Sequence, residues 1–296
     1  MSAQPGMPSV PPSPSVPPVP LLPSVPSVPP LPAVPATWNS RRVTERAECI
    51  LAPNPGVMTL DGTNTWVLRE PGSSTSVVVD PGPLDAGHLH RVRAAATPGD
   101  TRVGLVLLTH DHADHAEAAV EFAELVGAPL RAVRAIGAGH DDLSDGDRLS
   151  VSGLDLVVIT TPGHTADSVS FLLPADTALL TGDTVLGRGT SVVAWPDGEL
   201  TAYLESLERI AALCGTGAVT HVLPGHGPDL PDASAVLAHY LAHRFERLEQ
   251  VRAAVAAGAR TPREVVEVVY ADVPRAVWGA AELSVRAQLA YLEGQG

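Results

Sequence analysis

Three histidines and two aspartates lie within the six residues "HDHADH", from His110 to His115. The apolar run "VGLVLL" precedes this segment, and a helical pattern follows it. A solvated turn does not require such a cluster, and a packed core would not tolerate it without partners. Imidazole and carboxylate groups at this density are typical ligands of transition metals. The segment therefore predicts a metal site between a strand and a helix.

Five apolar runs end in a residue that can bind a metal or carry a proton. In α/β folds, ligands collect at one end of the strands, so parallel placement of these runs would bring their ends to one rim. Two of the runs end in Pro-Gly-His, and we expect glycine to supply the φ that a sharp turn needs there. One strand-ending histidine is usually a satisfied polar residue, but the combination predicts a metal centre. The five ends are Asp80, His110, His164, Asp183 and His226.

The elements that must position these residues are strands and amphipathic helices. We expect buried strands over 63–68, 75–80, 103–110, 154–164, 168–174, 177–183 and 221–226, because these runs are rich in β-branched residues and leucine. Helical periods occupy 116–126, with Gly127 as C-cap, and 199–214. After residue 231 the pattern is helical over 232–257 and 276–293, and a capping box at Thr261–Glu264 opens a further helix between them.

Composition divides the chain into three parts. Residues 1–37 hold 14 of the 29 prolines, which predicts a disordered or polyproline-II-like tail. Residues 38–230 are predicted to form a strand-rich α/β domain, and residues 231–296 a small helical domain.

Charge and cysteine content exclude some classes of function. All 19 basic residues are arginines. The net charge of −14 argues against a broad polyanion-binding face but leaves room for a local basic groove. The two cysteines are far apart in the sequence, so we expect a reducing compartment and no disulfide framework. No signal peptide and no apolar run of ~18 residues is found. These features predict a cytoplasmic protein without a membrane partner and leave its oligomeric state open.

The order and spacing of the histidines and aspartates resemble the ligand pattern of the metallo-β-lactamase fold superfamily. The resemblance implies an αββα sandwich with two metals at the edge between its sheets. It implies a first metal held by His110, His112 and His164, and a second held by Asp114, His115 and His226. Asp183 would bridge the two metals, and Asp80 would support the site.

Imidazoles and carboxylates without a thiolate favour two Zn²⁺ per chain, with Mn²⁺ or Fe²⁺ as alternatives. Two such metals can share a hydroxide, lower the pKa of water towards ~7 and polarise a carbonyl or phosphoryl oxygen. The expected nucleophile is this hydroxide. We expect Asp114 to orient the hydroxide and to take up its proton, so Asp114 is also the candidate catalytic residue.

A finer resemblance covers nearly the whole chain from about residue 45. The segments "NPGVMTLDGTNTWVL", "GDTVLGRGTSVV", "LPGHGP" and "HYLAHRFERLEQ" and the helical tail are similar to the lactamase-β-like endoribonuclease subfamily, whose tail is a winged-helix-like domain. Members of that subfamily cleave single-stranded RNA or, in fungi, hydrolyse carrier-protein thioesters. We favour an RNA phosphodiester as the substrate.

Other functions stay open beside RNA cleavage. The main alternative is hydrolysis of an acyl thioester or another small-molecule ester, on a carrier protein or as in glyoxalase II. A non-hydrolytic di-iron protein or a metal-stabilised binding protein is a further alternative. Antibiotic hydrolysis is disfavoured, because β-lactamases of the commonest zinc type carry Cys where Asp183 stands.

Five residues are candidate substrate contacts. Asn64 and Thr65 lie in a loop that resembles one facing the metals, and Arg188 and Thr190 lie in "GRGT". His243 follows His239 by four residues on a predicted helix, a spacing that would permit a metal site. Packing within the loops, and exposed histidines on the helix, are the plainer interpretations.

Overall fold

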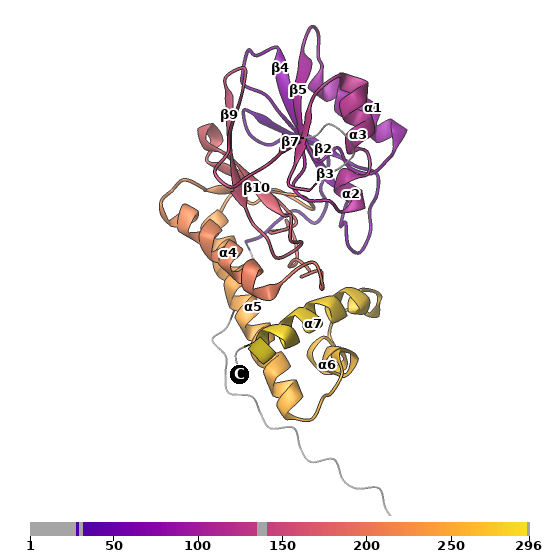
Figure 1. Cartoon of the computed structure of the whole chain (residues 1–296), viewed down its shortest axis with the longest axis vertical. Coiled ribbons are helices and arrows are strands. Elements are labelled where there is room, and N and C mark those ends of the chain that lie inside the picture. Colours follow the sequence, from indigo (N-terminus) through magenta and orange to yellow (C-terminus); the bar gives the residue numbers. More distant parts are fainter. Residues whose placement is uncertain (1–27, 30–31, 135–140, 295–296) are drawn as a thin grey trace, which may run out of the picture.

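The computed structural model describes residues 28–29, 32–134 and 141–294 (Figure 1). Most of the predicted disordered tail therefore lies outside the described residues. Two β-sheets make up the first part of the chain, and three helices close it.

The first sheet has seven strands in the order β1 to β7. Its central strands β4 and β5 are parallel, whereas β2 and β3 pair antiparallel. The strands are β1 (Arg41–Arg42), β2 (Ala47–Leu51), β3 (Asn64–Leu68), β4 (Thr75–Val79), β5 (Arg102–Leu107), β6 (Leu130–Ala132) and β7 (Asp141–Asp142).

The second sheet has five strands in the order β12-β11-β10-β9-β8. The pair β11 and β12 is parallel, and β10 pairs antiparallel with both β9 and β11. The strands are β8 (Arg148–Val151), β9 (Leu154–Thr160), β10 (Val169–Leu173), β11 (Ala178–Gly182) and β12 (His221–Pro224).

Alternation of side chains along the strands separates three apolar layers. The central layer joins the two sheets, with Trp66 and Leu107 of the first packed in one cluster with Phe171 of the second. On the outer face of the first sheet lie α1 (Ala86–Ala96) and α3 (Ala119–Val126). On the outer face of the second lie α4 (Leu200–Gly215) and part of α5 (Ala233–Ala256). This layering confirms the predicted αββα sandwich.

Five strands end at one edge of this sandwich. Because β4 and β5 are parallel, their ends meet, and the same holds for β11 and β12. Strand β9 runs in the direction of β11, since both are antiparallel to β10. The predicted convergence of the five apolar runs is therefore confirmed.

Some elements differ from the expectations. The helix expected over 116–126 is two helices, α2 (Ala113–Ala116) and α3, and α3 ends as predicted at Gly127 with a left-handed φ of 65°. The sequence patterns did not predict β1, β2, β6, β7, β8 and α1. Helix α1 was missed because its buried face includes His88 and few large apolar residues, which weakens the helical pattern.

The last three helices form the lower part of the molecule in Figure 1. Helix α5 packs against α4 through Val236 and Tyr240, and further along against α6 (Pro262–Val269) and α7 (Trp278–Gly294) through Val251. The predicted capping box at the start of α6 is confirmed. Apolar packing thus continues across residue 231, where a domain boundary was predicted. No helix in the described ranges is long and apolar enough to cross a membrane.

Candidate metal centre

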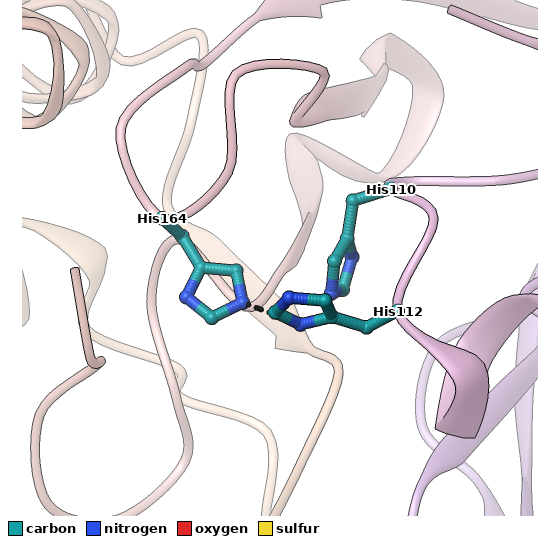
Figure 2. A group of neighbouring side chains, drawn as sticks. All are labelled: His110, His112 and His164. Carbon is teal, nitrogen blue, oxygen red and sulfur yellow. Dashed lines mark hydrogen bonds between the residues drawn. The ribbon is translucent and has the colours of Figure 1, made fainter. Parts of the chain in front are cut away.

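The seven predicted ligand residues lie together at this edge, on the loops that follow β5, β9, β11 and β12 and on the short helix α2. They form three overlapping groups, and within each group the ligand atoms lie within 4.8 Å of one another. Figure 2 shows one group, with His110 and His112 on one loop facing His164 on another. The groups are His110, His112 and His164; His110, His115 and Asp183; and Asp114, His115 and His226.

A hydrogen-bond chain orients the ring of His110. The Thr109 hydroxyl donates to Asp80 Oδ2 at 2.7 Å, so its oxygen accepts from His110 Nδ1 at 3.0 Å. The other ring nitrogen, Nε2, is buried without a hydrogen-bond partner among the described residues. The ring therefore presents a free lone pair to the centre of the group.

His164 is oriented in the same way by the backbone. Its Nδ1 donates to the carbonyl of Val192 at 2.6 Å, which leaves the Nε2 lone pair 3.1 Å from Nδ1 of His112 (Figure 2). Ligand atoms of a tetrahedral Zn²⁺ with bonds of 2.0–2.1 Å are separated by about 3.3 Å. The spacing of these two nitrogens is close to that value.

The second group repeats this arrangement. His115 Nδ1 donates to Asp80 Oδ2 at 2.9 Å, and His226 Nδ1 donates to the carbonyl of Gly62 at 3.2 Å. Their Nε2 atoms lie 3.3 Å apart. Asp114 Oδ2 lies 3.1 Å from Nε2 of His226 and 3.5 Å from Nε2 of His115. Asp80 therefore supports both groups, through the Thr109 hydroxyl and through His115.

The carboxylate of Asp183 lies between the two groups. Its Oδ1 is 3.4 Å from Nε2 of His115, and its Oδ2 is 3.4 Å from Nε2 of His226 and 3.7 Å from Nε2 of His164. Oδ1 is also buried without a hydrogen-bond donor in the described part of the chain. Lone pairs on oxygen and nitrogen that face one point without donors fit a divalent transition metal.

The two groups differ electrostatically when no metal is bound. Burial lowers the pKa of His110 well below its usual range. For His226 burial also opposes the charge, but Asp183 and Asp114 outweigh it and raise the pKa to about 9. Burial would raise the pKa of Asp114, but His115 and His226 lower it to about 2. The second group is therefore held together by protonated imidazole and carboxylate, whereas burial keeps the rings of His110 and His164 in the first group neutral.

Glycine serves two different purposes in the Pro-Gly-His turns. Gly163 has the expected positive φ, 132°, and a Cβ there would meet the backbone of Tyr203 at 2.3 Å. The expectation is wrong at Gly225, which has no positive φ. A Cβ at Gly225 would instead lie 2.6 Å from Asp183 Oδ1 and 2.7 Å from the His115 ring. Glycine is required there because the ligand side chains pass close to the backbone.

A cavity of about 340 Å³ adjoins the metal centre. It begins at His164 and Asp183 and ends against α5, α7 and the turn between α6 and α7. Much of its wall is apolar, including the half-exposed Val57 and Met58. The sandwich and the terminal helices thus share one cavity.

The predicted substrate contacts divide into two sets. Arg188, Thr190 and His243 line this cavity. Asn64 and Thr65 are fully buried and outside its lining. Asn64 donates to the carbonyls of Pro224 and Gly227 on either side of His226, and Thr65 donates to the Asp80 carbonyl. These two residues therefore stabilise the segments that carry His226 and Asp80.

Sequence reasoning missed several supporting residues. Thr109 stands directly before His110 in "LLTH", and this position was the signal that could have identified it. Arg244 is buried on α5 and donates to the carbonyl of Ser191, next to the residue whose carbonyl binds His164. Arg134 joins Asp111, inside the histidine motif, to Asp197. The contacts of Arg244 and Arg134 join residues more than 20 positions apart in the sequence, and no local pattern indicates them.

Comparison with known proteins agrees with this geometry. Residues 58–214 match the metallo-beta-lactamase superfamily, and residues 261–296 match the beta-lactamase associated winged helix domain. The chain belongs to the metallo-beta-lactamase superfamily. It is a hydrolase of that fold, and its tail carries the associated winged helix domain.

Relatives within the superfamily match most of the chain. The lactamase-like protein adaB of Aspergillus niger is 32% identical over 79% of this chain and 75% of its own length. The atrochrysone carboxyl ACP thioesterase of Aspergillus fumigatus is 32% identical over 78% of this chain and 76% of its own. A beta-lactamase domain protein from Burkholderia ambifaria has the same fold, with a TM-score of 0.73 and 23% identity over 88% of this chain and 90% of its own.

Proposed function

We propose that this protein is a metal-dependent hydrolase of acyl thioesters. The observation that carries the proposal is the cavity, which starts at the two ligand groups and continues between apolar walls to the terminal helices. A largely apolar cavity of this volume suits a small acyl group, because pockets for small molecules are concave and mostly apolar. The thioesterase among the relatives supports the same substrate class.

The ligand assignment in this proposal follows the two groups. His110, His112 and His164 would hold one metal, and Asp114, His115 and His226 the other, with Asp183 shared between them. Zinc fits best, because the donors are imidazoles and carboxylates in a nearly tetrahedral spacing. When bound, the metal pair supplies an activated water and a Lewis acid for the thioester carbonyl.

The protein residues have separate roles. Asp114 is the most exposed carboxylate of the centre, with 29% of its side chain accessible, and its Oδ2 lies 3.1 Å from Nε2 of His226. A carboxylate with a pKa of about 2 in the metal-free chain is ionised at neutral pH, so it can orient a water by accepting its hydrogen bond. Asp80 and Val192 fix the histidine rings, and the apolar cavity walls exclude water from the acyl group.

The RNA substrate favoured by the sequence has less support than the thioester. A nucleic-acid site requires a cationic track for the phosphates. The wall of the cavity is largely apolar, two of its three arginines are engaged by other protein groups, and the chain has a net charge of −14.

One preparation with measured metal content tests the proposal. It is assayed with acetyl and decanoyl thioesters of N-acetylcysteamine and with labelled single-stranded RNA. We expect both thioesters to be hydrolysed and the RNA to stay intact. The Ala280→Phe variant fills the cavity and should slow decanoyl turnover while acetyl turnover and metal content are kept. Ala290→Phe, on the same helix outside this cavity, is the matched control. RNA cleavage without thioester hydrolysis would overturn the proposal.

A further inference from the structure

The cavity carries a charge opposite to that of the whole chain. Three arginines contribute to its wall, and Asp183 is the single carboxylate among its lining residues, all of which lie in the described ranges. In a chain with a net charge of −14, this local excess of positive charge requires an explanation. The hydrogen-bond and ion-pair partners of each arginine show whether its guanidinium is free to bind a ligand.

Two of the three arginines have structural partners. Arg188 forms an ion pair with Asp61 and donates to the carbonyl of Pro35 at 2.9 Å. Arg244 is 4% exposed, donates to the carbonyl of Ser191 and stacks over the ring of Tyr203 at 4.7 Å. These contacts hold loops in place, so neither side chain is free to bind a ligand with its whole guanidinium.

Arg247 is different. It makes no ion pair with any described residue. Its Nη1 donates to the carbonyl of Val269 at 2.7 Å and to Gln250 at 2.9 Å, and its guanidinium lies 4.8 Å from the centre of the Tyr270 ring. Stacking and one anchored nitrogen orient the group, while Nε and Nη2 have no acceptor in the described part of the chain. A pre-oriented guanidinium with free donors is suited to a carboxylate or phosphate.

His243 lies one turn before Arg247 and lines the same wall. Its Nδ1 is buried with no hydrogen-bond partner in the described ranges. Burial, with Arg244 and Arg247 nearby, lowers the pKa of this imidazole to about 3, so the ring is neutral. A neutral ring can donate one hydrogen bond beside the guanidinium. An unpartnered buried nitrogen at this place is a second sign that the wall is built for a ligand.

We propose that Arg247 and His243 form an anion subsite at the helical wall of the cavity, which binds a negatively charged oxygen group on the thioester substrate. The inference rests on the proposed thioesterase function. The group is a carboxylate on the acyl chain or the phosphate of a pantetheine arm, since both present anionic oxygens to a guanidinium. The apolar residues beside it, Val273 and Val277, would contact the intervening carbon chain.

Two matched substrate pairs separate the two sources of charge. The first pair is the hexanoyl and 5-carboxypentanoyl thioesters of N-acetylcysteamine, which lack phosphate. The second is hexanoyl-pantetheine and hexanoyl-4′-phosphopantetheine. We expect kcat/KM to favour the charged member of one pair by about 10–100-fold, the range of a charge-assisted hydrogen bond. A preference in the first pair identifies an acyl carboxylate, and in the second an arm phosphate.

Variants of α5 assign the preference to Arg247. Arg247→Gln should remove it, so that kcat/KM of the charged member falls to that of the neutral member, and Arg247→Lys should restore part of it. Arg252→Gln is the matched control, because Arg252 is exposed on the same helix and pairs with Glu249. The proposal is overturned if neither pair shows a higher kcat/KM for its charged member, or if Arg247→Gln keeps that preference.

A binding measurement does not depend on thioester turnover. If an acyl carboxylate is the group bound, calorimetry on the metal-loaded full chain should find adipate bound more tightly than hexanoate. In Arg247→Gln the two affinities should be equal. If the phosphate is the group, 4′-phosphopantetheine should bind more tightly than pantetheine, with the same loss. Failure of thioester hydrolysis alone would remove the proposed function and leave this binding result standing. Loss of single-stranded RNA affinity in Arg247→Gln, with neither preference present, would overturn the inference in favour of a nucleic-acid contact.

Discussion

The two ends of the cavity are built in opposite ways. At the metal end, Nδ1 of His110, His115, His164 and His226 each has a hydrogen-bond partner, and the free atoms all face one centre. At the helical end, His243 leaves a buried nitrogen unpartnered, and the wall between the polar groups is apolar. Strand ends thus fix the reacting groups, whereas the helices shape the space for a substrate. The metal end should be sensitive to the loss of one atom, and the helical end to changes of volume and charge.

The largest expected effect comes from Asp183, which contacts both ligand groups. Asp183→Asn keeps the size of the side chain and removes its charge, so we expect metal content to fall from two ions per chain to one or none. Turnover should fall by at least about 10³-fold. Elemental analysis and a thioester assay measure both quantities. Asp229→Asn is the control, because that carboxylate pairs with His221 away from the centre. Full metal content in Asp183→Asn would refute the shared-ligand assignment.

A smaller effect is expected from Thr109, which is not a ligand itself but holds the ring of His110. Thr109→Val keeps the shape but breaks the hydrogen bonds to Asp80 and His110. Groups that orient a metal ligand typically contribute about 10–100-fold to metal affinity, and we expect a loss in this range. Competition with a chelator measures it. Thr220→Val, at an exposed position that bonds Thr177, should leave metal affinity unchanged. An equal loss in both variants would show that Thr109 has no special role.

The pH dependence should distinguish the two metal positions. His110 has a lowered pKa and is neutral at pH 7, whereas His226 must lose a proton with a pKa of about 9 before Nε2 can bind. The pKa of His115 in the same group is also raised, so apparent affinity at the second position should fall at least about tenfold per pH unit below about 9, and this ion should leave first on acidification. Metal titrations between pH 6 and 9 test the order. Simultaneous loss of both ions would contradict it.

The raised pKa of His226 has the opposite effect on the stability of the metal-free chain, which should fall as the pH rises. The folded-state pKa of His226 is raised above the unfolded value of 6.5, so its contribution to stability is complete below pH 6.5. It is lost as the pH rises through about 9. Thermal unfolding of the metal-free chain should thus shift to lower temperature over this window.

The smallest expected effect is confined to the helical end. Thr261→Ala removes the N-cap of α6 and should reduce the free energy of unfolding by about 1 kcal/mol. Metal content and turnover of acetyl thioesters should not change, because α6 lies outside the ligand loops. Thr261→Ser, which retains the cap, should behave as the unaltered chain in a denaturant titration. A fall in metal content would show that the two ends are coupled.

The metal end could be predicted from the sequence because its determinants are local. His110, His112, Asp114 and His115 lie in one short motif, and the other ligands directly follow apolar strands. Asp80 also directly follows a strand, and its carboxylate accepts hydrogen bonds from Thr109 and His115. Thr109 has no side-chain type that draws attention, although its position beside a ligand is significant.

The helical end could not be predicted, because its residues meet only through tertiary packing. Arg247 is one of several arginines on a charged helix, and the sequence does not show that it faces a cavity while Arg252 faces solvent. Asn64 and Thr65 show the reverse case. Their segment resembles a loop that faces the metals, but both residues open strand β3 and their side chains turn inward, where backbone carbonyls need donors.

Helix α5 has a consequence for how the chain unfolds. Its first half covers α4 and its second half holds α6 and α7, so one continuous helix is a member of two apolar clusters. Truncation at residue 231 would expose Leu207 and Ile210 and leave an apolar, aggregation-prone surface on α4. The sandwich and the terminal helices should accordingly melt in a single cooperative transition. The appended helices are an integral part of the folding unit that carries the metal centre.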